Sequence, residues 1–65
     1  MNSEIEAASI NQLHDLATEA VEKNLITAHG YRGSQYEILR QGEFVYFSPA
    51  AAIQFLQTLL RQIEL

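Results

Sequence analysis

The segment HGYRGSQYE, residues 29–37, is the part of the 65-residue chain where glycine, aromatic and basic residues are most concentrated. Gly30 and Gly33 have the spacing of a GxxG loop, which in some proteins clamps a nucleic-acid backbone. Arg32 lies between them, and exposed glycine N–H groups beside it could form a nest for a phosphate. A plain turn from helix to strand uses the same glycines, and we expect this role because a predicted hairpin follows the segment. If the loop has a further contact, Tyr31 and Arg32 are expected to make it.

The two histidines do not form a metal-binding pattern. His14 and His29 lie on different segments, neither has a second histidine three or four residues away, and the chain has no cysteine. A structural zinc site needs four converging ligands, most often sulfur and nitrogen. We therefore expect no metal site and no cofactor, and we expect His14 to lie at the edge of a buried helix face.

The serines have structural explanations. Ser3, Ser9 and Ser48 precede predicted helices, and Ser34 lies in the expected turn without an identifiable base. No pair of carboxylates has a recognisable catalytic context. A chain of this length also has difficulty enclosing a ligand-sized cleft while keeping a core. The sequence therefore predicts a protein that is not an enzyme.

The composition predicts one folded domain over residues 1–65. Hydrophobic residues make up 48% of the chain and charged residues 18%, which is too apolar for a disordered chain. A domain of this size buries only about 60% of the surface of its unfolded chain. Because cysteine is absent, disulfides cannot compensate for the low stability of so small a core. The chain can gain stability instead by self-association or by a very well packed core.

The net charge of −4 is carried by residues 1–24, which contain five acids and one lysine. This segment repels a phosphate backbone and no basic stripe exists elsewhere, so nucleic-acid binding is not expected. No apolar run is long enough to span a membrane, and the first residues carry acids where a signal peptide has basic residues. These features favour a cytoplasmic protein. An acidic helix face that docks a basic partner through Asp15, Glu19 and Glu22 is a further alternative.

The elements follow from periodicity and from capping residues. A helix is predicted from Ile10 to Lys23 with its start at either Ser3 or Ser9, and Asn24 is an acceptable stop. One of its faces is apolar, with Ile10, Leu13, Leu16, Ala17, Ala20 and Val21. A second helix is predicted from Pro49 to nearly Leu65, with Ser48 as its cap. Its apolar face is wider than one neighbour would cover and contains Ala52, Ile53, Phe55, Leu56, Leu59, Leu60 and Ile63.

Between the helices, YEILRQGEFVYF predicts a hairpin that turns at Gln41 and Gly42. A two-residue loop pairs Arg40 with Glu43 as an ion pair, Ile38 with Val45, and Tyr36 with Phe47 on one face. It pairs Leu39 with Phe44 and Glu37 with Tyr46 on the other face. A longer loop with a bulge at Gly42 would change these partners.

The expected fold class is α+β, in the order helix, β-hairpin, helix, with both helices packed on one face of the antiparallel sheet. Residues 25–28, with HGY after them, offer a third short strand as an alternative. One face of the hairpin is assigned to packing against the helices through Tyr36, Ile38, Val45 and Phe47.

The other hairpin face has no assigned neighbour, and such apolar surface is typical of association. The expected contact residues are Leu39, Phe44 and Tyr46, together with Phe55 and Leu59 of the last helix. The favoured function is a non-enzymatic protein–protein interaction module that forms a homodimer or small homo-oligomer. The alternative is a phosphate or nucleic-acid binder that uses Arg32 and the loop from Gly30 to Gly33.

The segment YRGSQYE, residues 31–37, resembles a YRGxxYE-like motif of small cyanobacterial proteins of unknown function. The matching residues are Tyr31, Arg32, Gly33, Tyr36 and Glu37. This resemblance covers about a tenth of the chain and implies no function. The order helix, hairpin, helix is similar to that of the small phage head-completion proteins, which are basic, so this second resemblance concerns architecture alone.

Overall fold

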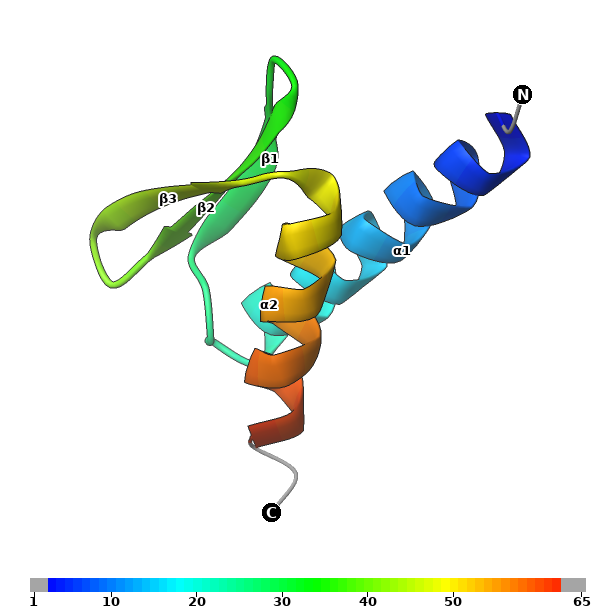
Figure 1. Ribbon diagram of the computed structural model, residues 1–65. Helices are drawn as coiled ribbons and strands as arrows, with labels where there is room; N and C mark the ends of the chain where they lie inside the picture. The colour runs from blue at the N-terminus through cyan, green and yellow to red at the C-terminus, as the bar shows by residue number, and fades with distance from the viewer. Residues whose placement is uncertain (1–2, 63–65) are drawn as a thin grey trace.

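The computed structural model describes residues 3–62, and it places side chains for residues 11–62. The chain forms a helix, three strands and a second helix (Figure 1). Their bounds are α1 Ser3–Glu22, β1 Ala28–Arg32, β2 Gln35–Arg40, β3 Glu43–Phe47 and α2 Pro49–Gln62. The predicted α+β order is confirmed, and the strands form an antiparallel sheet in the order β1-β2-β3. The expected extension of the last helix beyond Gln62, with Ile63, lies outside the described residues.

Helix α1 begins at Ser3, the first of the two predicted starts, and its end is set by Asn24. Asn24 has a φ of 60°, the left-handed conformation that asparagine tolerates better than most residues. The Asn24 N–H donates to the carbonyl of Val21 at 3.0 Å, and the Leu25 N–H donates to that of Ala20 at 2.8 Å. These two bonds form a Schellman motif, which satisfies the last carbonyls and redirects the chain.

Strand β1 corrects the expectation that Gly30 and Gly33 together form a turn. Asn24 has already reversed the chain, so Gly30 lies inside β1, where it pairs with Glu37. Only Gly33 belongs to the turn, with a φ of 62° as the first residue of a two-residue connection. Positive φ at this position is typical of a type II′ hairpin and favours glycine. The third strand is therefore present, a few residues later than residues 25–28.

The hairpin of β2 and β3 has the predicted register. Ile38 faces Val45, Tyr36 faces Phe47, and Leu39 faces Phe44 on the opposite side. Arg40 and Glu43 are also opposite each other, but they do not form the expected ion pair. The ion pairs within residues 11–62 join Lys23 to Glu19 and Arg32 to Glu37.

The turn between β2 and β3 has a residue that fits its backbone poorly. Gln41 has a φ of 54° and Gly42 a φ of 80°, the pattern of a type I′ turn. Asparagine is preferred at the first central position because it tolerates the left-handed conformation. We expect Gln41→Asn to raise the free energy of unfolding by roughly 0.5–1 kcal/mol. Urea unfolding followed by circular dichroism measures this gain, and an unchanged or lower stability would contradict the turn assignment.

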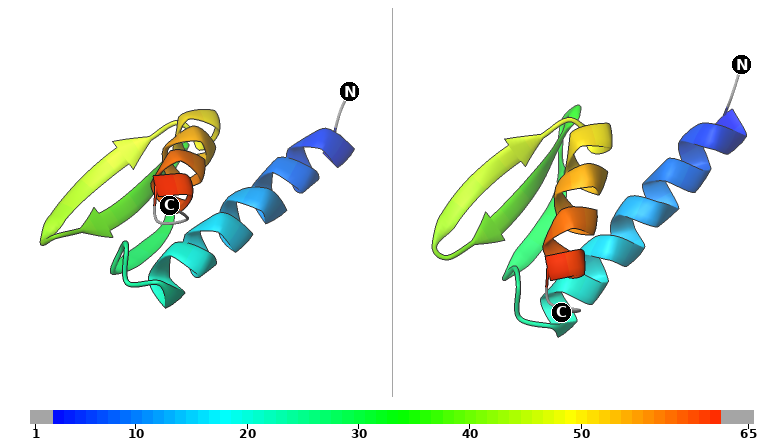
Figure 2. Two further views of the ribbon diagram at one scale, coloured as in Figure 1. Left: turned by 90° about the horizontal axis from the view of Figure 1, so that it is seen from below. Right: turned by 60° about the horizontal axis from the view of Figure 1, so that its bottom comes forward.

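Helix α2 starts as predicted and lies between the hairpin and α1 (Figures 1 and 2). The Ser48 hydroxyl accepts a hydrogen bond from the Ala51 N–H at 3.2 Å, and Pro49 is the first helical residue. Helix α1 packs mainly against α2, whereas α2 also contacts β2 and β3. The wide apolar face of α2 thus has two neighbours, which explains why so much of it is apolar.

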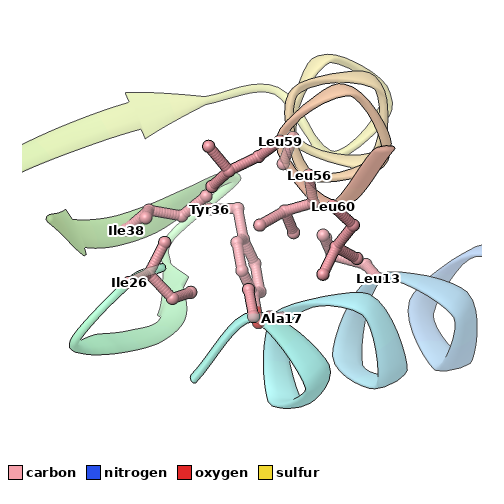
Figure 3. Close-up of a cluster of buried hydrophobic side chains, with 10 residues drawn as sticks. Leu13, Ala17, Ile26, Tyr36, Ile38, Leu56, Leu59 and Leu60 are labelled. Atoms are coloured by element: carbon pink, nitrogen blue, oxygen red, sulfur yellow. The ribbon is translucent and has the colours of Figure 1, made fainter. Parts of the chain in front are cut away.

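A single hydrophobic cluster joins the elements (Figure 3). The Tyr36 ring, 2% exposed, points from β2 toward Ala17 of α1, with Leu56 of α2 nearby. Most core members predicted from periodicity are confirmed. Within residues 11–62, the buried residues are Leu13, Ala17, Ala20, Ile26, Tyr36, Ile38, Ala52, Leu56, Leu59 and Leu60.

Candidate functional site

Leu39, Phe44 and Tyr46 lie on the sheet face opposite Tyr36 and Ile38. The register pairs Leu39 with Phe44, and neighbouring residues on a strand alternate between the two faces. Phe44 is 56% exposed and Tyr46 is 48% exposed, while Leu39 is half-buried. We call these three residues the open-face cluster. It supplies exposed apolar surface on two adjacent strands.

A polar network borders the open-face cluster. The Arg32 Nε–H donates to Oε2 of Glu37 at 3.1 Å, and the Tyr46 hydroxyl donates to the same oxygen at 2.9 Å. The hydrogen bond to Glu37 raises the pKa of Tyr46, because the phenolate cannot donate it; slight burial and the nearby carboxylate charge act in the same direction. The Glu37 carboxylate on β2 therefore accepts hydrogen bonds from side chains on both β1 and β3.

The positions of Gly30 and Arg32 disfavour the alternative in which this segment binds phosphate. That alternative needs Gly30 and Gly33 in one loop beside Arg32, but Gly30 lies within β1. The guanidinium of Arg32 is also paired with Glu37, although 68% of its side chain is exposed. An anion at Arg32 would have to compete with an existing carboxylate. Tyr31, the other candidate loop residue, is 45% exposed and lies on β1.

We expect Glu37→Gln to lower the pKa of Tyr46 toward its ordinary value of 10. The substitution replaces the charged acceptor of the Tyr46 hydrogen bond, the main cause of the raised pKa, and removes the carboxylate charge that opposes ionisation of the phenol. The ring resonances of Tyr46, followed by NMR as the pH is raised, report the titration directly. Asn11→Gln is a matched control on α1, where the same titration should be unchanged. A Tyr46 pKa that does not move in Glu37→Gln would contradict this network.

The two α2 residues predicted for the contact surface have different environments. Phe55 is half-buried, and its ring stacks on Phe47 with centroids 4.9 Å apart and an interplanar angle of 25°. Leu59 is only 7% exposed and belongs to the core. The structure therefore does not bring the five predicted contact residues together on one face. Phe55 lies on the helix side of β3, and Leu59 offers little area to a partner.

Val45 is an exposed residue that the sequence reasoning assigned to the core. It faces the buried Ile38 in the register, yet it is 40% exposed. The tip of the β2–β3 hairpin lies away from both helices (Figures 1 and 2), so no helix covers the side chains near it. The position of Val45 only three residues after Gly42 of the turn is the signal that could have predicted its exposure.

Open grooves lined by described residues lie beside α2. One, of about 190 Å³, is lined by Arg40, Phe55, Thr58, Leu59 and Gln62. The other, of about 230 Å³, is lined by Leu16, Glu19, Gln57, Leu60 and Arg61. Within residues 11–62, neither groove contains a histidine or a serine.

The structure brings His14 and His29 together, although they are 15 positions apart in the sequence. Their ring centroids lie 5.8 Å apart with an interplanar angle of 66°. His29 Nδ1 is hydrogen-bonded to the Tyr36 hydroxyl, and Tyr36 in turn meets Tyr31 edge-on at 4.9 Å. Partial burial, and then the nearby His14, lower the pKa of His29. Sequence reasoning missed this pair because it depends on β1, which was only an alternative there.

Comparisons with protein-family models, curated proteins and solved structures find no match to the chain. The resemblance at residues 31–37 therefore stays a prediction. Between residues 3 and 62, neither helix is both long and apolar enough to cross a membrane.

Proposed function

We propose that this protein is a non-enzymatic interaction module of the cytoplasm that forms a homodimer through β3 and the open-face cluster. The observation that carries the proposal is the exposure of Phe44, Val45 and Tyr46, three consecutive large apolar residues on one strand. Consecutive strand residues point to opposite faces, so this apolar surface wraps around the strand. A surface of this kind is stabilised when a partner covers both faces.

In this proposal the helices cover β2 on one face of the sheet, and the partner covers the open-face cluster together with the exposed Val45 near the hairpin tip. Tyr36 and Ile38 on β2 support this arrangement, because they share the buried cluster with Leu13 of α1 and Leu56 of α2. The open-face cluster projects in the opposite direction. A partner can therefore cover it without displacing either helix.

The edge position of β3 favours a second copy as the partner. Strand β3 is the last in the order β1-β2-β3, so the backbone N–H and C=O groups on its outer side lack a strand partner among residues 3–62. Natural edge strands are commonly protected by lysine, proline or a bulge, and β3 contains neither of those residues and pairs without a bulge. Two copies can pair antiparallel about a two-fold axis at Val45. Phe44 of one copy then lies opposite Tyr46 of the other, a favourable aromatic pair.

Edge pairing also includes part of α2 in the contact. The rings of Phe44 and Tyr46 together offer about 200 Å² of exposed area, well below the roughly 800 Å² per partner of a specific interface. An interface centred on the edge reaches both faces of the sheet. It adds Leu39 on one side and Val45 with Phe55 on the other. This geometry gives Phe55 a contact role although it is not on the open face.

NMR spectra recorded over a twenty-fold dilution test the contact surface. We expect concentration-dependent shifts for the backbone amides of β3 and for the side chains of the open-face cluster. The exposed residues Asn11 and Gln12 of α1 should not change. Spectra that are independent of concentration, or shifts confined to α1, would contradict the proposal. The second outcome would instead favour the alternative in which the acidic face of α1 is the contact.

A further inference from the structure

Two imidazoles from separate elements converge at the junction of α1 and β1. His14 comes from α1 and His29 from β1, with 5.8 Å between their ring centroids. The His14 side chain is exposed, so surrounding packing constrains its rotamer little, whereas His29 is half-buried. One fixed imidazole and one adjustable imidazole are therefore available at the same point on the surface.

Tyr36 fixes the orientation of His29. Its hydroxyl is hydrogen-bonded to His29 Nδ1, and its ring is buried and held edge-on by Tyr31. When Nδ1 carries the proton and donates to the hydroxyl oxygen, Nε2 keeps a free lone pair. Metal-binding histidines commonly have this arrangement, in which the second ring nitrogen donates to an oxygen that orients the ring.

We propose that His14 and His29 bind one borderline divalent metal ion, of the class of Zn²⁺, Ni²⁺ or Cu²⁺, through their two imidazoles. With metal–nitrogen distances of about 2.0–2.1 Å, two imidazoles on one tetrahedral ion have ring centroids about 5 Å apart. The observed separation of 5.8 Å differs from this by less than an ångström. Rotation of the exposed His14 side chain is sufficient to close the difference.

The site has only two protein ligands. No group of three or more His, Cys, Asp or Glu residues converges within the described part of the chain. The ion therefore keeps at least two positions for water or an external ligand, and its affinity is weaker than that of a four-ligand structural site. Imidazole suits copper, nickel and zinc and not magnesium or calcium. Because the two ligands come from α1 and β1, the ion also links the helix to the sheet and stabilises the folded chain.

Isothermal titration of the full chain with ZnCl₂, NiCl₂ and CuCl₂, with MgCl₂ as a negative control, tests this site. We expect one ion per chain, tightest binding for Cu²⁺, no binding of Mg²⁺, and a metal-dependent rise in the melting temperature. His14→Ala should weaken binding at least tenfold and abolish the rise, because His14 is exposed and its loss leaves the fold intact. Gln54→Ala, on the exposed side of α2, is the control and should bind as the wild type does.

Tyr36→Phe tests whether metal binding requires the Tyr36 hydroxyl to orient His29, or only the proximity of the His14 and His29 imidazoles. It keeps the buried ring and removes the hydroxyl, and loss of such an orienting group weakens metal binding by about 10–100-fold. Circular dichroism verifies that each variant is folded. Absence of binding at 100-fold excess of metal, one ion per two chains, or unchanged affinity in His14→Ala would each overturn the proposal.

Discussion

Ile38→Ala is expected to leave most molecules of the protein unfolded at room temperature. Ile38 is completely buried at the centre of the sheet, in the cluster that joins both helices to β2. Removal of three carbons from such a position costs about 2–5 kcal/mol, because a cavity replaces the lost contacts. A single core in a domain of this size supplies only about 3–5 kcal/mol of net stability. The loss is therefore comparable to the whole free energy of unfolding.

Val45→Ala is the matched control, since Val45 is the cross-strand partner of Ile38 on the same face of the sheet. Val45 is 40% exposed, so we expect its truncation to cost clearly less than that of Ile38. Because Val45 lies on the axis of the proposed dimer, far-UV circular dichroism during urea unfolding compares the two variants at a protein concentration low enough for both to be monomeric. Equal destabilisation of both would contradict the assignment of the core to β2 and of the exposed surface to β3.

Phe44→Glu is expected to convert the proposed dimer to monomer while the chain remains folded. In the proposed pairing, each copy would bury a carboxylate opposite Tyr46 of the other, and the nearby cation, Arg32, is already paired with Glu37. The uncompensated charge costs several kcal/mol, and the two-fold symmetry introduces it twice. Because Phe44 is 56% exposed in the single chain, its replacement leaves the core intact. We expect the dimer dissociation constant to rise by at least 100-fold.

Asn11→Glu is the control for added charge. Asn11 is exposed on α1, away from β3, so the same extra negative charge should leave the dimer unchanged. Sedimentation equilibrium of both variants gives the association constants, and circular dichroism confirms folding. Dissociation of both variants would indicate that net charge, rather than the β3 surface, controls association. A dimer that persists in Phe44→Glu would place the interface elsewhere.

Local signals predicted the parts of the fold that depend on short stretches of sequence. The Gln41-Gly42 turn and the alternation around it predicted the full register of β2 and β3. Ser48 with Pro49 predicted the start of α2, and Asn24 predicted the end of α1. In each case a few residues determine the backbone through capping or through positive φ. Such features do not depend on distant parts of the chain.

The features that depend on distant contacts were harder to predict. Strand β1 contains Gly30 and no β-branched residue, so its extended conformation comes from pairing with β2 rather than from its own propensity. The contact of His14 with His29 depends on that pairing. The exposure of Val45 and the burial of Leu59 depend on how far α2 extends over the sheet. Periodicity identifies an apolar face but not the length of the neighbour that covers it.

The mass of the wild-type protein in solution tests the central claim most directly. Static light scattering at micromolar concentration should give twice the 7.4 kDa mass of the chain. The mass should fall toward that of the single chain on dilution, as expected for a reversible dimer. A mass of 7.4 kDa throughout the micromolar range would contradict the proposed homodimer.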